Sequence, residues 1–179
     1  GPGRIGDDGD VGDTYNWCPP ADDVVVDAPT EVEVVVARRG PVSATVTITG
    51  AHVLPATAVG QRRSLDGAVE RIGWTTTIEL RAGEPTVRVT TELDNRARDH
   101  RLRAWFPLPQ RATPSRAECA YAVVERGLVA EGGPTEVGLP TFPSRRFVQA
   151  GGLTVLHDGL LEYELVDLDG DGHDERTTA

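Results

Sequence analysis

The feature that most constrains the fold of this chain is a period-two alternation of apolar and polar residues that begins near residue 31. Every second residue of 31–36 is Val32, Val34 or Val36. A second run from residue 42 places Val42, Ala44, Val46 and Ile48 on one side and Ser43, Thr45, Thr47 and Thr49 on the other. A period of two puts alternate side chains on opposite faces of a strand. The two runs therefore predict half-buried β-strands, separated by a turn at 38–41.

The rest of the chain continues this pattern in shorter pieces. Further strands are predicted over 74–80, 86–93, 100–108, 117–125, 146–150, 153–157 and 161–166. The three strands between 74 and 108 have short connections, which predicts an antiparallel meander. Residues 56–70 and 127–144 are predicted to be loops, and almost no window shows the 3.6-residue period of a helix. We therefore expect an all-β fold with little helix: a large antiparallel β-sandwich of about nine strands, forming a single domain over residues 1–179.

Composition and charge exclude several classes of function. The net charge of −10 argues against binding to nucleic acid or to an anionic membrane. No stretch reaches the roughly 20 apolar residues needed to cross a bilayer, and no signal-peptide pattern is present, so we expect a cytoplasmic protein. All 18 basic residues are Arg, which indicates a GC-rich bacterial source. The chain has no Met, even at position 1, so we interpret it as an excerpt of a longer protein.

Residues 1–22 are predicted to form a loop, and its segment Gly12–Pro20 is unusual in content. It combines Tyr15 and Trp17 with Asp13, Asn16, a cysteine and two prolines. Aromatic faces beside carboxylate and amide groups suit the binding of sugars. The alternative is that these aromatic residues only fill a gap at the edge of a sheet.

The acidic tail offers one candidate metal site. The spacing of Asp167, Asp169 and Asp171 resembles the first half of an EF-hand calcium loop. Position 12 of such a loop would be Thr178 rather than the required Glu, and no helices are predicted to flank it. The alternative is an acidic β-turn in residues 167–179, a hairpin tail truncated in its second arm.

No other set of residues points to catalysis. The four histidines lack the spacing of a zinc site, and no complete catalytic constellation is found in the sequence. We therefore assign no catalytic residue, no metal ligand and no cofactor to this chain.

Three stretches together resemble glycoside hydrolase family 38, the α-mannosidase family that includes bacterial mannosylglycerate hydrolases. Residues 12–20 are similar to that family's Gly-Asp-x-Tyr-Asn/Asp-aromatic-x-Pro segment. Residues 91–103, with Asp94-Asn95 and Asp99-His100-Arg101-Leu102-Arg103, look like its strand–turn–strand motif. Residues 147–164 resemble a third family segment, except that His157 stands where the family commonly has Asn.

The resemblance implies a supersandwich similar to galactose mutarotase-like domains. It also implies that the zinc, its ligands and the nucleophile of a retaining mechanism lie in an α/β barrel followed by a helical domain, outside this chain. A tyrosine of the β region is thought to reach the sugar in this family, and by motif position the candidates are Tyr15 with its neighbours Asp13 and Asn16. For residues 94–103 the structural interpretation is favoured, with a buried Arg101 or Arg103 paired to nearby acids.

These observations predict the C-terminal β-domain of a family 38-type α-mannosidase, which supports the active site of a zinc-dependent barrel. Its expected partners are the barrel and helical domain of the same polypeptide and a carbohydrate substrate. We expect no hydrolysis of α-mannosides by these 179 residues alone. A stand-alone carbohydrate-binding or structural module without catalysis is the alternative, and a calcium-binding β-module is a third interpretation.

Overall fold

The computed structural model describes residues 3–13, 17–112, 114–128, 132–135 and 138–166. The chain divides into two compact units, residues 1–106 and 107–179, each of which is described by itself. Every regular element in the described ranges is a β-strand and the paired strands are antiparallel, so the predicted all-β class is confirmed. Within those ranges no helix has the length and apolar character needed to span a membrane. The expectation of a single domain stays a prediction.

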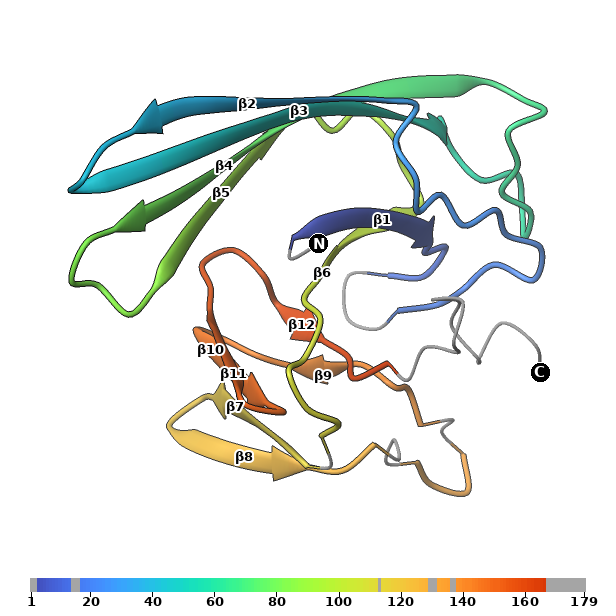
Figure 1. Ribbon diagram of the computed structural model, residues 1–179. Coiled ribbons are helices and arrows are strands. Elements are labelled where there is room, and N and C mark those ends of the chain that lie inside the picture. The colour runs from blue at the N-terminus through green and yellow to red at the C-terminus, as the bar shows by residue number, and fades with distance from the viewer. Residues whose placement is uncertain (1–2, 14–16, 113, 129–131, 136–137, 167–179) are drawn as a thin grey trace. The chain divides into compact units, whose positions relative to one another are not determined.

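Two antiparallel sheets make up the first unit (Figure 1). The larger sheet has the order β2-β3-β4-β5, with strands β2 (Glu31–Arg39), β3 (Ser43–Pro55), β4 (Val69–Arg81) and β5 (Val87–Leu93). The smaller sheet pairs β1 (Arg4–Gly9) with β6 (His100–Trp105). The predicted meander is therefore correct for β4 and β5, but wrong for β6, which pairs with the N-terminal strand instead.

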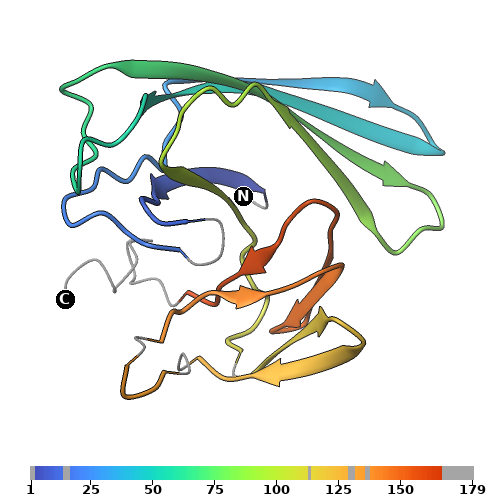
Figure 2. The ribbon, with the colours of Figure 1, turned by 180° about the vertical axis from the view of Figure 1, so that it is seen from behind.

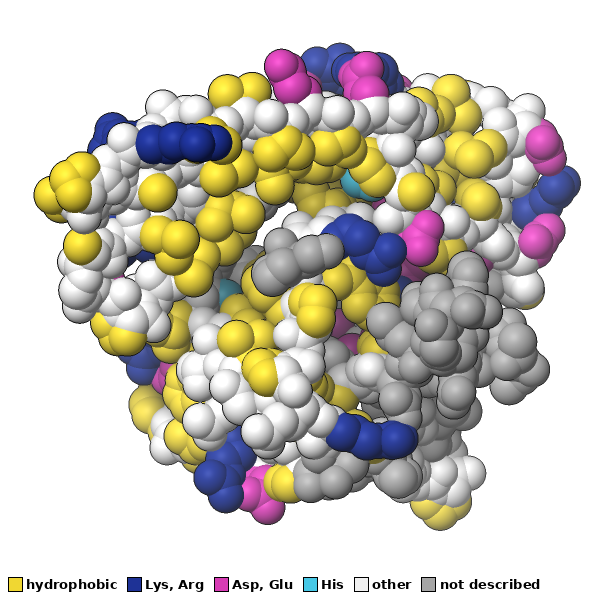
Figure 3. Space-filling model, viewed as in Figure 1, with side chains coloured by type: hydrophobic (Ala, Val, Ile, Leu, Met, Phe, Trp, Pro, Cys, Tyr) yellow, Lys and Arg dark blue, Asp and Glu magenta, His cyan; other side chains and the backbone are white. Residues whose placement is uncertain are grey.

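The larger sheet has two chemically different faces. Its register aligns Val34 with Ile48 and Ile78 with Val89, so apolar side chains of all four strands share one face. We call this the apolar face: Val32, Val34, Val36, Val46, Ile48, Trp74, Ile78, Leu80, Val87, Val89 and Leu93. The register also puts Thr76 and Thr91 on it, and their hydroxyl groups are hydrogen-bonded to each other at 2.9 Å. The opposite face carries Thr, Glu and Arg, and Figure 3 shows charged side chains on the outer side of the sheet and hydrophobic ones along the inner side.

The small hydrophobic core of the first unit lies at one end of this same face. Leu54 at the end of β3 and Ile72 near the start of β4 are buried with Ala97, and Val26 and Leu102 pack against them. The core therefore joins the larger sheet to the β1–β6 pair, which lies beneath that end of the sheet in both ribbon views (Figures 1 and 2). Farther along, Val32, Val34 and Val36 are exposed. The predicted strand over residues 31–36 therefore exists, but the prediction that it is half-buried is wrong, because every residue of β2 is exposed.

The predicted loop over residues 1–22 is corrected at residues 4–9, which form β1. Glycine at position 6 allows this strand to pass close to a large neighbour. A Cβ there would lie 2.7 Å from Nε1 of Trp105, so a larger residue would displace the indole. The strand is buried from Ile5 to Gly9, although it contains two aspartates.

The second unit contains short strands only. They are β7 (Ser115–Cys119), β8 (Ala122–Arg126), β9 (Phe142–Pro143), β10 (Phe147–Ala150), β11 (Leu153–Leu156) and β12 (Glu162–Tyr163), in the orders β11-β10-β7-β8 and β12-β9. The single strand predicted over 117–125 is wrong, because the chain turns at Tyr121, which has φ 63°. The predicted hairpin tail at 167–179 lies outside the described residues.

Candidate functional site

The segment that follows β1 is a loop closed at its base. The N–H of Val11 donates to the carbonyl oxygen of Cys18 at 2.9 Å. The Asp10 carboxylate accepts the N–H of Gly12 at 3.2 Å and that of Cys18 at 3.0 Å. Both arms of the loop are therefore bonded to one another, and Asp13 follows the closure. Asp13 is exposed there, whereas Tyr15 and Asn16 lie outside the described residues.

Trp17 fixes the returning arm of this loop to the strand that precedes it. Its indole N–H donates to the carbonyl oxygen of Gly9 at 2.9 Å. The guanidinium carbon of Arg101 lies 3.7 Å from the centre of the indole ring. A stacked cation of this kind contributes about 0.5–2 kcal/mol, more when water is excluded. The aromatic residue next to the proposed sugar-binding positions is therefore an anchor of the loop.

Arg101 is itself held by a carboxylate on the neighbouring strand. The β1–β6 register places Asp8 directly opposite Arg101 and Gly6 opposite Arg103. Asp8 accepts two bonds from Arg101, Nε to Oδ1 at 2.7 Å and a terminal nitrogen to Oδ2 at 2.9 Å, and Arg103 lies 3.0 Å from Oδ2. Two-pronged pairing fixes the plane of the guanidinium as well as its position. The predicted pairing of Arg101 and Arg103 with an acid is confirmed, but both side chains are only partly buried, at 15% and 20% exposed.

Asp7 points to the other side of β1, because adjacent strand residues face opposite ways. Its carboxylate forms an ion pair with Arg63 and contacts Nδ1 of His100. Arg63 also donates to the carbonyl oxygen of Val24 at 2.9 Å and pairs with Asp23 at 3.2 Å. Asp7 and Arg63 are each 1% exposed, so both charges are neutralised inside the protein rather than by water.

Burial shifts the titration of this cluster. It lowers the pKa of Arg63 to about 10, so the guanidinium remains charged at neutral pH. Burial also lowers the pKa of His100, and the nearby charge of Arg63 acts in the same direction. Asp7 alone would favour the imidazolium, but its charge is already shared with Arg63. Nδ1 contacts the Asp7 carboxylate and Nε2 lies 3.0 Å from the side-chain oxygen of Asn95. Both partners are acceptors, so a neutral ring can donate to only one of them.

A second acid ties the end of the 94–99 segment to the chain after β3. Asp99 has φ 54°, and its carboxylate accepts the hydroxyl of Thr57 and the N–H of Ala58, the latter at 3.0 Å. These two hydrogen bonds lower its pKa. The carbonyl oxygen of Asp99 accepts the N–H of Asp10 at 3.1 Å, which adds a further contact to the base of the loop. The structural interpretation of residues 94–103 is therefore supported.

This arrangement fixes a loop and offers no reacting pair of carboxylates. Asp7 and Asp8 face opposite ways and are bonded to guanidinium groups, so neither is placed beside the other as an acid–base pair would require. In the described ranges, no three His, Cys, Asp or Glu side chains gather into a possible metal site. The calcium candidates Asp167, Asp169 and Asp171 lie outside those ranges. The described residues give no donor set for zinc.

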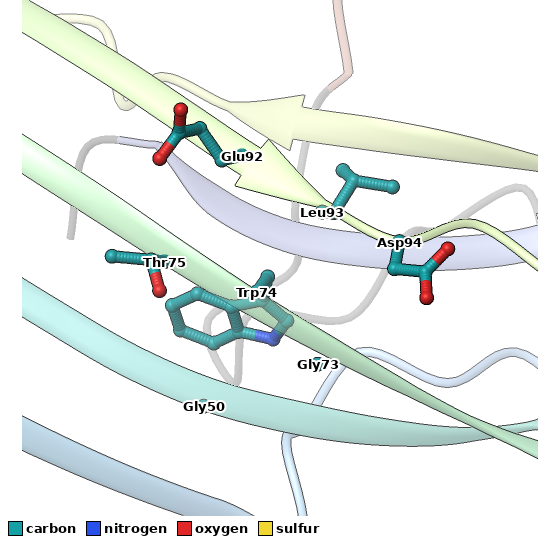
Figure 4. A pocket seen from close by; sticks show the side chains of 7 residues that line it. All are labelled: Gly50, Gly73, Trp74, Thr75, Glu92, Leu93 and Asp94. Atoms are coloured by element: carbon teal, nitrogen blue, oxygen red, sulfur yellow. The ribbon is translucent and has the colours of Figure 1, made fainter.

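A shallow pocket of about 410 Å³ lies elsewhere, on the larger sheet. Its lining is Gly50, Gly73, Trp74, Thr75, Glu92, Leu93 and Asp94, and Figure 4 shows the Trp74 ring extending from β4 toward Gly50 on β3. Trp74 donates its N–H to Nδ1 of His52 at 2.9 Å, so its polar edge is already used. Thr75 pairs with Glu92 in the register, one position away from Trp74, so both belong to the opposite face of the sheet. The polar groups do not converge on the indole.

Sequence reasoning missed the acids and the arginine that hold the site together. Asp7 and Asp8 stood in a segment predicted to be a loop, and Arg63 in one without a clear period. An acidic pair next to glycines gives no signal of burial by itself. The usable signal was the basic Asp99–Arg103 segment, for which buried partners were expected but could not be named.

Comparison with known proteins gives this architecture a family. Residues 5–169 match the model of the glycosyl hydrolases family 38 C-terminal domain. A curated protein of Halalkalibacterium halodurans named "Putative mannosylglycerate hydrolase" is 28% identical over 184 residues, which cover 89% of this chain and 20% of that protein.

Two solved structures from Enterococcus faecalis share the fold. One, a protein in glycosyl hydrolase family 38, is 24% identical with a TM-score of 0.74. The match covers 92% of this chain and 21% of that protein's chain. The other, an α-mannosidase, is 23% identical with a TM-score of 0.77. That match covers 96% of this chain and 21% of the α-mannosidase chain. This chain thus spans about a fifth of the length of these relatives. The matched model covers most of the sequence, so the chain belongs to the glycosyl hydrolase family 38 C-terminal domain family.

Proposed function

We propose that this chain is the C-terminal β-domain of an enzyme that hydrolyses α-mannosidic bonds, and that its loop of residues 12–20 lines the substrate site. The catalytic groups then belong to other domains of the same polypeptide, an α/β barrel with zinc and a helical domain. The family match and the short share of each relative that the chain covers support this proposal. Asp13, Tyr15 and Asn16 are the proposed sugar-contacting residues.

The observation that carries the proposal is the way the loop is anchored. Its base is closed by Asp10, and its returning arm is held by Trp17 between Gly9 and Arg101. Fixing a loop at its base lowers the entropy lost when its far end binds a ligand. The chemistry of a tyrosine fits the role, since it offers a flat apolar face and a hydroxyl.

The test is Tyr15→Phe in the intact enzyme, with an aryl α-mannoside as substrate. We expect kcat/KM to fall roughly tenfold or more, the scale of one lost hydrogen bond to the substrate. Tyr121→Phe is the matched control, because Tyr121 is fully exposed in the β7–β8 turn, and it should keep wild-type kinetics. Wild-type kinetics for Tyr15→Phe would exclude the contact.

The alternative, a stand-alone carbohydrate-binding module, gains little from the pocket beside Trp74. Sugar sites combine an aromatic platform with convergent polar groups. Here Thr75 and Glu92 lie on the opposite face from the indole, and the indole N–H is bonded to His52. The loop of residues 12–20 is therefore the better candidate for contact with a sugar.

A further inference from the structure

Gly9, the last residue of β1, contacts the returning arm of the loop, residues 17–20, in two ways. Its carbonyl oxygen accepts the indole N–H of Trp17 at 2.9 Å. A Cβ at this position would lie 2.5 Å from Cγ and 2.6 Å from Cδ of Pro20, so the backbone of residue 9 lies directly against the proline ring. Pro20 is buried and Trp17 is half-buried, whereas Cys18 and Pro19 between them are exposed. Both inward-facing side chains of the arm therefore contact Gly9.

Gly9 is itself held by the carboxylate of Asp23. The N–H of Gly9 donates to Oδ2 of Asp23 at 2.7 Å, and Oδ1 of the same carboxylate pairs with Arg63 at 3.2 Å. The side chain of Arg63 is fully buried and that of Asp23 is 17% exposed. A hydrogen bond to a charged group is stronger than a neutral one, and more so where water is scarce. One residue thus joins the buried charges to the arm of the loop.

The space at residue 9 admits only glycine. An added Cβ would also lie 2.9 Å from Oδ1 of Asp23, and all three of these distances are shorter than a Cβ atom tolerates. The ring of Pro20 is rigid, and the Asp23 carboxylate is tied to two donors. Neither can yield without moving the arm or the strand. Even a methyl group at residue 9 should therefore displace the returning arm.

These contacts differ in effect from the closure at Asp10. The Asp10 carboxylate joins the two arms of the loop to one another. Gly9 and Asp23 instead fix the returning arm to β1 and to the buried Arg63. A closed loop can still tilt as a whole on its base, so the second set of contacts decides where its far end is directed.

We propose that Gly9 and Asp23 are positioning residues for the sugar contact of Tyr15. They set the place of the returning arm, and the arm sets the place of Tyr15 against the substrate. This inference rests on the proposed function, because only that function gives Tyr15 a substrate to contact. Misplacing a contact group by about 1 Å can reduce a rate by a factor of up to about a hundred.

The experiment uses the intact enzyme with an aryl α-mannoside, and each test variant has a matched control. Gly9→Ala is compared with Gly67→Ala, because a Cβ at Gly67 would meet no atom within 4 Å. Asp23→Asn is compared with Asp22→Asn, because the Asp22 carboxylate pairs with Arg62 on the surface. We expect both test variants to lower kcat/KM roughly tenfold. Both controls should keep wild-type kinetics.

Combination with Tyr15→Ala separates positioning from a general loss of stability. If Gly9 acts through Tyr15, the two losses have one cause and do not multiply. The double variant should then stay within about threefold of the weaker single variant in kcat/KM. A loss equal to the product of the two single losses would overturn the proposal. If Gly9→Ala does not fold, the same cycle with Asp23→Asn decides the question.

Fluorine NMR of enzyme labelled with fluorotryptophan measures the place of the arm apart from activity. The resonance that is missing from Trp17→Phe belongs to Trp17. It should shift in Gly9→Ala and Asp23→Asn and stay in place in both controls. An unshifted resonance in the two test variants would overturn the inference.

A shifted resonance with wild-type kcat/KM would overturn the inference as well, because the arm would then move without effect on the substrate. Tyr15→Phe distinguishes this result from a failure of the proposed function. A loss of activity in Tyr15→Phe, with wild-type activity in Gly9→Ala and Asp23→Asn, would refute the positioning alone. Wild-type activity in all three would contradict the sugar contact itself.

Discussion

The two ends of the apolar face differ in a way that the residues on it do not explain. Leu54 and Ile72 at one end are buried, while Val34 and Leu80 at the other are exposed. The alternation of apolar residues continues through both ends, so the local pattern is the same and only the neighbouring segments differ. Alternation therefore marks a face that is built to be covered, but carries no information about which segment covers it.

The layer that covers the buried end reverses the usual distribution of residues. Asp7, Asp8 and Arg63 are buried in and beside β1, while valines of β2 are exposed. Buried charges are tolerated because each carboxylate contacts at least one guanidinium group at close range. The buried end thus depends on complete pairing, whereas the exposed end leaves Val34 and Leu80 more than half exposed. Substitutions should separate the two ends.

The largest effect is expected where a buried charge loses its partner. Arg63→Met leaves Asp7 without a guanidinium, which should lower the free energy of unfolding by about 3–5 kcal/mol. The control is Arg62→Met, since Arg62 pairs with Asp22 on the surface and such pairs contribute about 0–1 kcal/mol. Urea unfolding followed by tryptophan fluorescence measures the first unit, which contains Trp17, Trp74 and Trp105. Equal losses for both variants would contradict the account of the buried end.

A smaller effect should separate two leucines on the same face. Leu54→Ala opens a cavity in the core and should cost about 2–5 kcal/mol of unfolding free energy. Leu80→Ala, at the exposed end, should cost less than about 1 kcal/mol in the 179-residue chain, because its side chain is already half in water. The same urea titration measures both. A large loss for Leu80→Ala in this chain would show that the exposed end is already packed.

The smallest effect is a pH dependence from the buried end. Burial lowers the pKa of His100 below that of the unfolded chain, so the unfolded state binds more protons as the pH falls through about 6.5. Stability should then decrease with falling pH below that value, by at most about 1.4 kcal/mol per pH unit from this group. His100→Gln should flatten the difference between unfolding free energies at pH 7 and pH 5.5. An unchanged difference would mean that the pKa of His100 is the same in the folded and unfolded states.

The larger sheet could be predicted well because its strands show an alternation of apolar and polar residues within their own short segments. The alternation in residues 31–36 and 42–48, with the turn at 38–41 between them, is enough to identify β2 and β3. The β7–β8 hairpin was missed because its turn contains neither Gly nor Pro, and Tyr121 adopts a positive φ that its residue type does not announce. The strand β1 was missed because Gly6, Asp7, Asp8 and Gly9 are poor strand formers, and only pairing with β6 makes them a strand.

The candidate site was predicted in part for a similar reason. Residues 12–20 were recognised from their content, and Arg101 and Arg103 from their motif. The hydrogen bond from Cys18 to Asp10 and the ion pair of Arg101 with Asp8 join residues that are distant in the sequence. A periodic pattern within one segment cannot predict such contacts. Arg63 gave no signal at all, because a lone arginine in an irregular segment is normally solvated.

The pairing of β1 with β6 also sets an order of assembly. Asp8 and Arg101 are 93 residues apart, and closing a loop of that length costs about 4 kcal/mol of chain entropy by the (3/2)RT ln n rule. The β2–β3 and β4–β5 hairpins close over a few residues, so we expect the larger sheet to form first and to serve as the surface on which β1 settles. The loop that carries the proposed sugar contacts follows directly after β1. The loop would then be closed only in the last step of folding, so the proposed sugar contacts should depend on the fully assembled domain.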